Sequence, residues 1–337
     1  MKPLAFFLAL ALPAAAQTID PHAIEAHVRF LASDDLEGRE TGTRGFDVAA
    51  AYVKAQFDAA RMETQLQPMS FRSAAVGEQS MRIGGIDLTP RTDFALQPSF
   101  VDATMDLTAP VVFAGQGIVA PEFDHDDYAN IDVHGRVVVI VTGAPAEFGI
   151  DPRAYYSGSL RKARVAAARG AIGALLVNSE ADERRAPFAR IAQQASIPSM
   201  RAVDPNGHIA GVTSLRVSGR ISAATAERLR ATPSVTIHLA TELANARSAN
   251  VIGIIRGADE RLRNEFVVAS AHLDHLGTHD RQGTSDRIYN GAQDNASGIA
   301  CLIEIARALA KQPPKRSVMF VAFTGEEKGE QGSGFFA

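Results

Sequence analysis

Two short apolar runs in the last part of the sequence constrain the fold more than any other feature. Residues 266–271 (Phe-Val-Val-Ala-Ser-Ala) and 317–323 (Ser-Val-Met-Phe-Val-Ala-Phe) each have the length and composition of a strand that is buried on both faces. Residues 295–311 lie between them, carry apolar side chains at helical spacing and end at two prolines. The order strand, helix, strand predicts a βαβ unit with parallel strands joined by a right-handed crossover.

Polar residues follow both runs and precede the helix. They are His272 and Asp274 after the first run, Asp294 before the helix, and Glu326 and Glu327 after the second run. Because the carboxyl ends of parallel strands meet at the edge of the sheet where ligands bind, we expect all five side chains to converge there. Carboxylates that are brought together repel one another and resist desolvation. A pair of divalent cations explains such a cluster, and a solvated acidic rim is the alternative.

Three ordered motifs carry these residues. They are residues 271–277 (Ala-His-Leu-Asp-His-Leu-Gly), 290–298 (Asn-Gly-Ala-Gln-Asp-Asn-Ala-Ser-Gly) and 325–327 (Gly-Glu-Glu). Together they resemble the M28 metallopeptidases, dizinc exopeptidases that include many bacterial aminopeptidases. The resemblance implies two Zn²⁺ ions, with His272 on one, Asp294 bridging both and Glu327 on the other. It also implies Glu326 as the general base, and Asp274 as the carboxylate that orients His272.

The number of ligands leads to an expectation about the chain itself. A catalytic zinc ion has three protein ligands and an open position, whereas these assignments give each ion two. In the family, the remaining ligands are an aspartate and a histidine well downstream, and this sequence ends ten residues after Glu327. We therefore expect a C-terminally truncated fragment that is inactive alone. His275 and His279 flank the site, and we expect them to be pocket or solvent residues rather than ligands.

The first 16 residues have the pattern of a secretory signal peptide. Lys2 is followed by an apolar run at residues 4–12 and by three alanines before Gln17. The run is too short to span a bilayer, and an uncleaved membrane anchor is the alternative. The mature chain is therefore expected to be secreted or periplasmic in a bacterium, with no membrane partner.

Two amphipathic helices are predicted after the signal peptide. Asp20 and Pro21 are the N-cap and first-turn residue of one helix, and an apolar stripe over residues 46–57 marks the other. Both are expected to pack against the βαβ unit. Glu37 and Arg39 lie in the loop between them, where we expect a structural role rather than contact with substrate.

A change in composition near residue 107 predicts an inserted domain. Short strands are expected at residues 111–114, 137–141, 174–177 and 235–239, with a helix over residues 160–169. Residues 126–140 and 170–177 resemble the protease-associated (PA) domain, which some secreted M28 peptidases carry inside the catalytic domain. The predicted domains are residues 17–106 (first part of the peptidase), 107–243 (PA) and 244–337 (peptidase core). The fold class is α/β: a mostly parallel sheet with flanking helices, plus a β-rich α/β insertion.

Composition and absent motifs narrow the function further. A net charge of −4 without a basic block argues against nucleic acid. The sequence has no Gly-x-Ser-x-Gly, His-Glu-x-x-His or phosphate-loop motif, so serine hydrolases, thermolysin-like proteases and nucleotide hydrolases lose support. Cys301, the single cysteine, excludes an internal disulfide and is expected to be buried in its helix.

These observations predict a secreted zinc exopeptidase that hydrolyses peptides through a metal-activated water. The choice of aminopeptidase over carboxypeptidase follows from the resemblance alone. The alternative is a secreted PA-domain binding protein with a vestigial zinc site. The sequence leaves the oligomeric state open.

Overall fold

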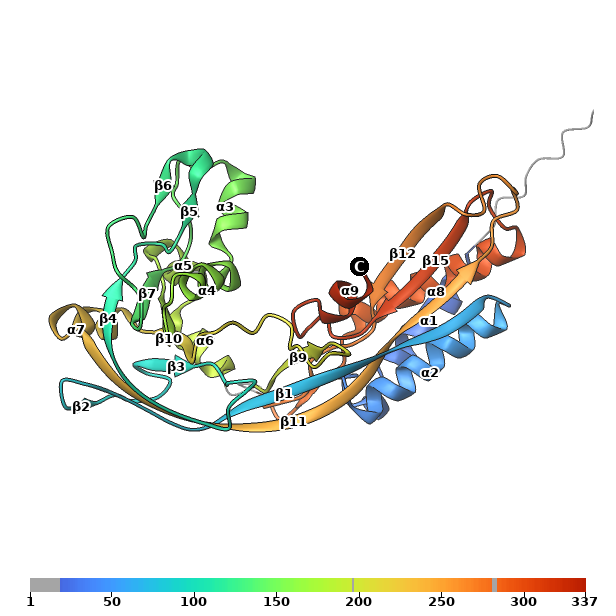
Figure 1. The fold of residues 1–337 in the computed structure, drawn as a ribbon. Coiled ribbons are helices and arrows are strands. Elements are labelled where there is room, and N and C mark those ends of the chain that lie inside the picture. The colour runs from blue at the N-terminus through green and yellow to red at the C-terminus, as the bar shows by residue number, and fades with distance from the viewer. Residues whose placement is uncertain (1–18, 196, 281–283) are drawn as a thin grey trace, which may run out of the picture. The chain divides into compact units, whose positions relative to one another are not determined.

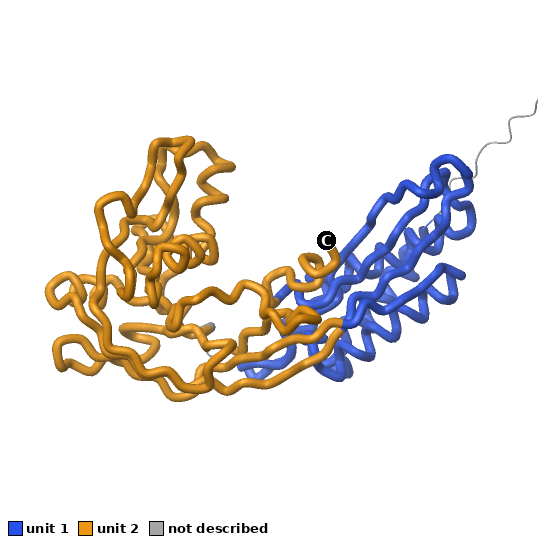
Figure 2. The backbone as a smooth tube through the Cα atoms, in the orientation of Figure 1, with its two compact units in different colours: residues 1–68, 249–327 blue, residues 69–248, 328–337 orange. Residues whose placement is uncertain are grey.

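The chain forms two compact units (Figure 2). The computed structural model describes residues 19–195, 197–280 and 284–337, so the predicted signal peptide lies outside the described residues. Unit 1 consists of residues 1–68 and 249–327, and unit 2 of residues 69–248 and 328–337. Two long strands, β1 (Glu63–Ile83) and β11 (Ser234–Ile255), supply residues to both units. Unit 2 thus contains the whole segment predicted as the PA insertion, together with residues on either side of it.

The βαβ unit is present in unit 1. Strands β12 (Phe266–His272) and β15 (Ser317–Phe323) are parallel and in register from the Phe266–Ser317 pair to the His272–Phe323 pair. Helix α8 (Ser297–Lys311) connects them. On its other side, β15 pairs antiparallel with the last residues of β11, and β1 pairs with β11. Both strands and the helix therefore confirm the prediction from the sequence.

The two N-terminal helices pack against this unit, as expected. Helix α1 (Pro21–Leu31) begins at Asp20, whose carboxylate accepts a hydrogen bond from the backbone N–H of His22, and α2 (Arg44–Ala59) follows the short turn η1 (Asp34–Leu36). Figure 1 shows α1, α2 and α8 along the same part of the sheet. One apolar core joins helix residues to alternate residues of the strands; it includes Leu31, Phe46, Val53, Phe57, Val251, Ile299, Leu302, Ile303, Val318 and Phe320.

Two expectations about burial in unit 1 are wrong. Strand β12 was predicted to be buried on both faces, yet Phe266, Val267 and Val268 are 41%, 52% and 51% exposed. Among the described strands, β12 pairs with β15 alone, so its outer side has no neighbour in the sheet. Cys301 is exposed rather than buried, because the inward stripe of α8 passes through Ile299 and Leu302 and a position two residues after Ile299 faces away.

Unit 2 contains a mixed sheet that is covered on both faces. Strands β4 (Thr104–Phe113), β7 (Val137–Val141), β8 (Gly173–Val177) and β10 (Val217–Ile221) are parallel neighbours in that order. An antiparallel strand flanks each side, β11 next to β4 and β3 (Phe94–Leu96) next to β10. Val137 and Val139 enter one apolar core, whereas Val138 and Ile140 enter another. This alternation is typical of a sheet buried between two layers.

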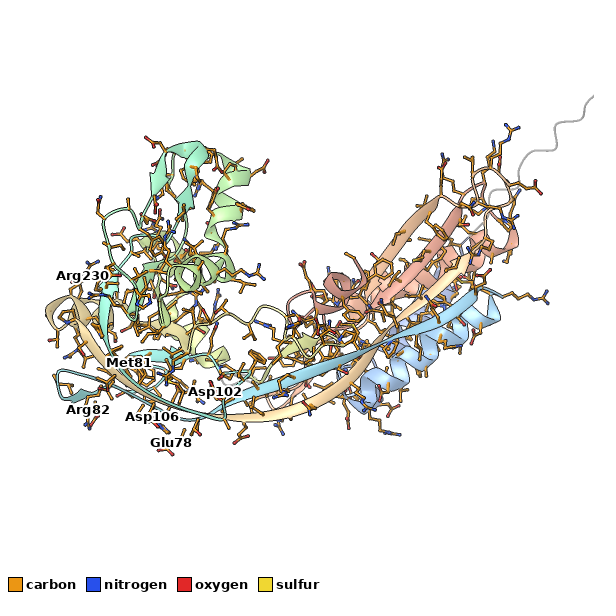
Figure 3. The ribbon with its side chains drawn as sticks, in the orientation of Figure 1. Glu78, Met81, Arg82, Asp102, Asp106 and Arg230 are labelled. Carbon is orange, nitrogen blue, oxygen red and sulfur yellow. The ribbon has the colours of Figure 1, made fainter. Side chains whose placement is uncertain are left out.

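Strand β1 was not predicted. It pairs antiparallel with β2 (Ile86–Asp87) and β9 (Ser199–Val203). Near the end of β1, Met81 is buried, whereas Glu78 and Arg82 are exposed (Figure 3). Arg82 forms an ion pair with Asp87 of β2 at 2.7 Å. The buried positions of β1 are separated by irregular polar stretches, so the alternation of buried and exposed residues that is typical of a strand is hard to detect in the sequence.

The remaining elements are short, and most of them belong to unit 2. They are β5 (Val119–Ala120), η2 (Pro121–Phe123), β6 (His125–Asp126), α3 (Ile150–Ser157), α4 (Ser159–Ala168), α5 (Glu180–Arg185), α6 (Phe188–Gln194), α7 (Ala223–Ala231) and α9 (Gln331–Phe336), and in unit 1 β13 (Gly277–Thr278), β14 (Ile288–Tyr289) and η3 (Ala292–Ala296). The helices and strands of the two units together confirm the α/β class. Among the described residues, no helix combines the length and apolar character needed to cross a membrane.

Candidate metal centre

The register of β12 and β15 places the predicted site residues at one end of the sheet. His272 is the last residue of β12 and lies opposite Phe323, the last residue of β15. Glu326 and Glu327 follow β15 in a turn. Asp294 lies in η3, immediately before α8, where its backbone dihedrals (φ −118°, ψ 93°) leave the helical region. The structure therefore brings these four side chains to the carboxyl ends of the parallel strands, where the sequence predicted them.

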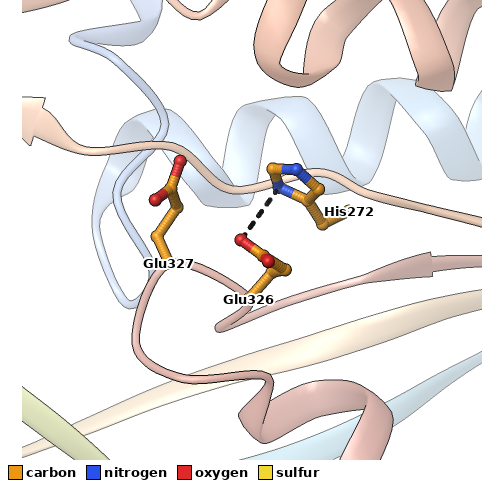
Figure 4. Close-up of side chains that lie close together, drawn as sticks. All are labelled: His272, Glu326 and Glu327. Atoms are coloured by element: carbon orange, nitrogen blue, oxygen red, sulfur yellow. Dashed lines mark ion pairs between the residues drawn. The ribbon is translucent and has the colours of Figure 1, made fainter. Parts of the chain in front are cut away.

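Ligand atoms of these residues lie close to one another. His272 Nε2 is 2.9 Å from Asp294 Oδ1. His272 Nδ1 is 3.9 Å from Glu326 Oε2, the ion pair that the dashed line in Figure 4 marks. Ligand atoms of His272, Glu326 and Glu327 all lie within 4.8 Å of one another. The side chains of Asp294 and Glu326 are 66% and 41% exposed, so this layer of donors is open to solvent and to a substrate.

The main chain of Asp274, rather than its carboxylate, orients His272. The backbone oxygen of Asp274 lies 3.1 Å from His272 Nδ1, whereas the nearer carboxylate oxygen is 4.0 Å away, beyond hydrogen-bond range. A hydrogen bond from Nδ1–H to this carbonyl selects the tautomer whose Nε2 is free to bind a metal. The sequence placed Asp274 correctly next to His272, but the contact runs through a different group.

The carboxylate of Asp274 instead fixes the two glutamates. It is completely buried. Its Oδ1 accepts a hydrogen bond from the backbone N–H of Glu326 (3.1 Å), and its Oδ2 accepts from the N–H of Glu327 (3.2 Å) and from Thr41 Oγ1 (3.0 Å). Burial raises the pKa of Asp274, and the two backbone hydrogen bonds oppose that rise. Thr41, in the loop before α2, gave no signal in the sequence.

Arg39 connects the loops that carry the donors. It is 1% exposed, as expected for a structural residue. Its guanidinium donates hydrogen bonds to backbone carbonyls of three segments: Leu31 at the end of α1, Leu273 after β12 (3.0 Å), and Asn290 (2.6 Å) and Gly291 (3.1 Å) before η3. Burial lowers the pKa of Arg39 to about 10, and the nearby Asp274 and Asp294 carboxylates oppose that change. The loops of His272 and Asp294 are therefore held at a fixed separation.

His275 lies closer to the centre than expected. Its Nδ1 is 2.6 Å from Glu327 Oε1, and its side chain is 11% exposed. Ligand atoms of His275, Asp294 and Glu327 form a second group within 4.8 Å of one another. The prediction that His275 is a pocket or solvent residue rather than a ligand did not include this contact with Glu327. Its position three residues after His272, at the same edge of the sheet, was the available signal.

The electrostatics of the centre suit a bound cation. The pKa of Glu326 is raised, first by burial and then by the charges of Glu327, Asp274 and Asp294, whereas His272 opposes the rise. Several carboxylates thus repel one another around the imidazoles of His272 and His275. A divalent cation removes this repulsion, and imidazole nitrogen with carboxylate oxygen is a donor set that zinc takes. The residues present therefore fit a zinc centre.

Comparison with known proteins agrees with this reading. Residues 250–337 match Peptidase family M28, and residues 107–209 match the PA domain. A probable zinc metalloprotease from Leptosphaeria maculans is 40% identical over 91 residues, which cover 27% of this chain and 20% of that protein. A second, from Pyricularia oryzae, is 35% identical over 89 residues, covering 26% and 17%. The matched stretch thus spans about a fifth of the length of these relatives.

Two solved structures share the fold over nearly the whole chain. An aminopeptidase from Aneurinibacillus sp. strain AM-1 has a TM-score of 0.58 at 22% identity, over 94% of this chain and 66% of that one. A zinc aminopeptidase from Bacillus subtilis has a TM-score of 0.51 at 19% identity, over 95% and 65%. At these identities the likeness concerns the fold. The family matches themselves come from the sequence: residues 250–337 match peptidase family M28 and residues 107–209 match the PA domain.

Proposed function

We propose that this chain carries the metal centre of a zinc-dependent exopeptidase, an aminopeptidase that removes N-terminal residues from peptides. The observation that carries the proposal is the convergence of His272, Asp294, Glu326 and Glu327 at one end of β12 and β15. The M28 match and the zinc metalloproteases among the relatives support the class of enzyme. The choice of aminopeptidase rests on the two solved structures named above.

Each residue of the centre has a role in this proposal. His272 and Asp294 would hold one zinc ion, and Asp294 and Glu327 the other. When bound, the two ions supply positive charge that polarises the scissile carbonyl and acidifies a water molecule.

Glu326 is the proposed general base. Its backbone is fixed by Asp274, and its partly exposed side chain reaches the open side of the centre. The raised pKa of Glu326 suits a group that accepts a proton from the attacking water and then delivers it to the leaving amine. Because Glu326 also lies within reach of His272 and Glu327, a role as a metal ligand must be tested separately.

The proposal also covers the signal peptide, the domain boundaries and the substrate. Residues 1–16 would direct export to the periplasm or the medium and then be removed. Residues 17–106 and 244–337 would form the peptidase domain, and residues 107–243 the inserted domain. The substrate would be a peptide, with no role for nucleic acid.

The substitution Glu326→Gln separates these roles in the full-length protein. An amide cannot take the proton from water, so hydrolysis of a peptide with a free N-terminus should fall by about 10²–10⁴-fold while bound zinc is retained. The same peptide with an acetylated N-terminus should resist the unmodified enzyme. Glu260→Gln, an exposed glutamate of the same unit, serves as the control and should change neither value.

Three results would contradict the proposal. Turnover of Glu326→Gln near that of the unmodified protein would remove the general base, and loss of zinc would make Glu326 a ligand. Equal cleavage of the acetylated peptide would exclude an aminopeptidase. A protein that binds zinc yet cleaves neither peptide would favour the binding-protein alternative.

A further inference from the structure

We propose that His275 is a positioning residue of the metal centre, which holds the Glu327 carboxylate in place through a hydrogen bond from Nδ1–H. This inference rests on the proposed function, because it assigns Glu327 to an ion. It starts from the 2.6 Å separation of His275 Nδ1 and Glu327 Oε1. The side chains of both residues are largely buried, so this contact is less exposed than the carboxylates of Asp294 and Glu326.

The distance between the two side chains is that of a hydrogen bond. A separation of 2.6 Å falls at the short end for a charge-assisted hydrogen bond. His275 is therefore a hydrogen-bond donor to Glu327, and the variants described below test this role against direct coordination.

The imidazole of His275 is held on several sides. Its backbone N–H donates to the carbonyl of Arg39 at 3.2 Å. Gly291, at φ +61°, lies against the ring so closely that a Cβ there would be 2.6 Å from His275 Cδ2. The ring of Tyr289 meets it edge-on, with centroids 6.4 Å apart. A donor that cannot rotate away restricts the carboxylate to which it is bonded.

Glu327 is consequently fixed at both ends. Its backbone N–H is bonded to Asp274 Oδ2, and its carboxylate to His275. Partners of this kind raise the affinity of metal sites because the ligand does not have to be ordered when the ion binds. His279 differs, since its Nε2 lies 3.6 Å from Glu40 Oε2 and it belongs to neither group of candidate donors.

The test compares three variants of the full-length protein by titrating zinc against a competing chelator. His275→Phe keeps a planar ring and removes the donor, and it should weaken binding of one of the two ions by about 10–100-fold. His275→Asn places an amide N–H close to the position of Nδ1–H and should recover most of this loss. His279→Phe is the matched control and should bind zinc like the unmodified protein. Melting of each zinc-free variant verifies that it is folded.

Two outcomes would overturn the inference. One is unchanged zinc affinity in His275→Phe. The other is a His275→Asn variant that binds zinc as weakly as His275→Phe, which would identify His275 as a direct ligand. Where His275→Phe does not fold, a tenfold or greater loss in folded His275→Asn overturns the inference by itself. Failure of the proposed function is recognised separately, because the unmodified protein would then hold no zinc or would cleave no peptide.

Discussion

Each unit buries a cation against backbone carbonyls. The cation of unit 1 positions the loops of the metal centre, whereas that of unit 2 only stabilises its own unit. Arg39 in unit 1 and Lys162 in helix α4 of unit 2 are each 1% exposed. Lys162 donates to the carbonyl oxygens of Gln116 and Gly143, the latter at 2.8 Å. A guanidinium has five donors in a planar fork and reaches three segments, whereas an ammonium has three and here joins two. Only the segments joined by Arg39 lead to the metal centre.

The two cations also differ in how readily they lose their proton. Burial lowers the pKa of both, to about 10 for Arg39 and to about 8 for Lys162. Nearby carboxylates oppose the change in each case, those of Asp127 and Asp182 at Lys162. The charge of Arg39 is therefore constant over the working range of an enzyme. Lys162, with a pKa of about 8, loses its proton close to that pH range.

The largest effect is expected from Arg39→Met. It leaves four carbonyls without their donor and the buried Asp274 without a nearby positive charge, so unit 1 should lose about 3–5 kcal/mol of stability. Hydrogen exchange of β12 and β15 should accelerate while β7 and β8 of unit 2 keep their protection, and zinc affinity should fall. Unchanged exchange in β12 would show that Arg39 does not hold these loops. Arg39→Lys should be intermediate.

The second effect is a dependence on pH that is specific to unit 2. A lysine in the unfolded chain has a pKa near 10.4, so between about pH 8 and 10 the unfolded state binds more protons than the folded state. The free energy of unfolding of unit 2 should therefore rise with pH over this interval, by about 2 kcal/mol in total. Urea unfolding followed by circular dichroism measures it. Subtracting the same curve for Lys162→Met removes the contribution of other groups, and parallel curves would refute the assignment.

The smallest effect is expected from Lys162→Met at pH 7. Two hydrogen bonds are lost, but the cost of burying a charge disappears with them, so the net loss should be about 1 kcal/mol. Zinc affinity should stay at its original value, because neither Gln116 nor Gly143 belongs to the unit that holds the donors. A zinc affinity that falls as far as in Arg39→Met would end the distinction between the two cations.

The sequence predicted the parts of the site that follow from strand geometry. The carboxyl ends of parallel strands lie side by side, so residues such as His272 and Glu327 could be brought together without knowledge of side chains. The contacts of Thr41 with Asp274 and of His275 with Glu327 were not predicted, because they depend on side-chain directions within loops. The same holds for Asp274, whose neighbour was identified correctly but whose carboxylate turns toward the backbone of the glutamates.

The fold shows a similar division. Apolar runs and helical stripes identified β15, α8 and the N-terminal helices, because each repeats its pattern over several residues. The exposure of β12 was not predictable, since a run of apolar residues indicates a strand but not whether another element covers it. The length of β1 was hidden for a different reason: its buried residues are spaced irregularly among polar ones.

The two hydrogen bonds from Glu326 and Glu327 to one carboxylate have a consequence for thermal motion. Because the two N–H groups belong to adjacent residues and share Asp274 as their anchor, a displacement of that anchor moves both glutamates in the same direction. Fluctuations of the loop are therefore correlated between the proposed base and the proposed ligand, and their separation varies less than the position of either one. A centre built in this way tolerates small movements of the surrounding chain while the proposed base and the proposed ligand keep nearly the same separation.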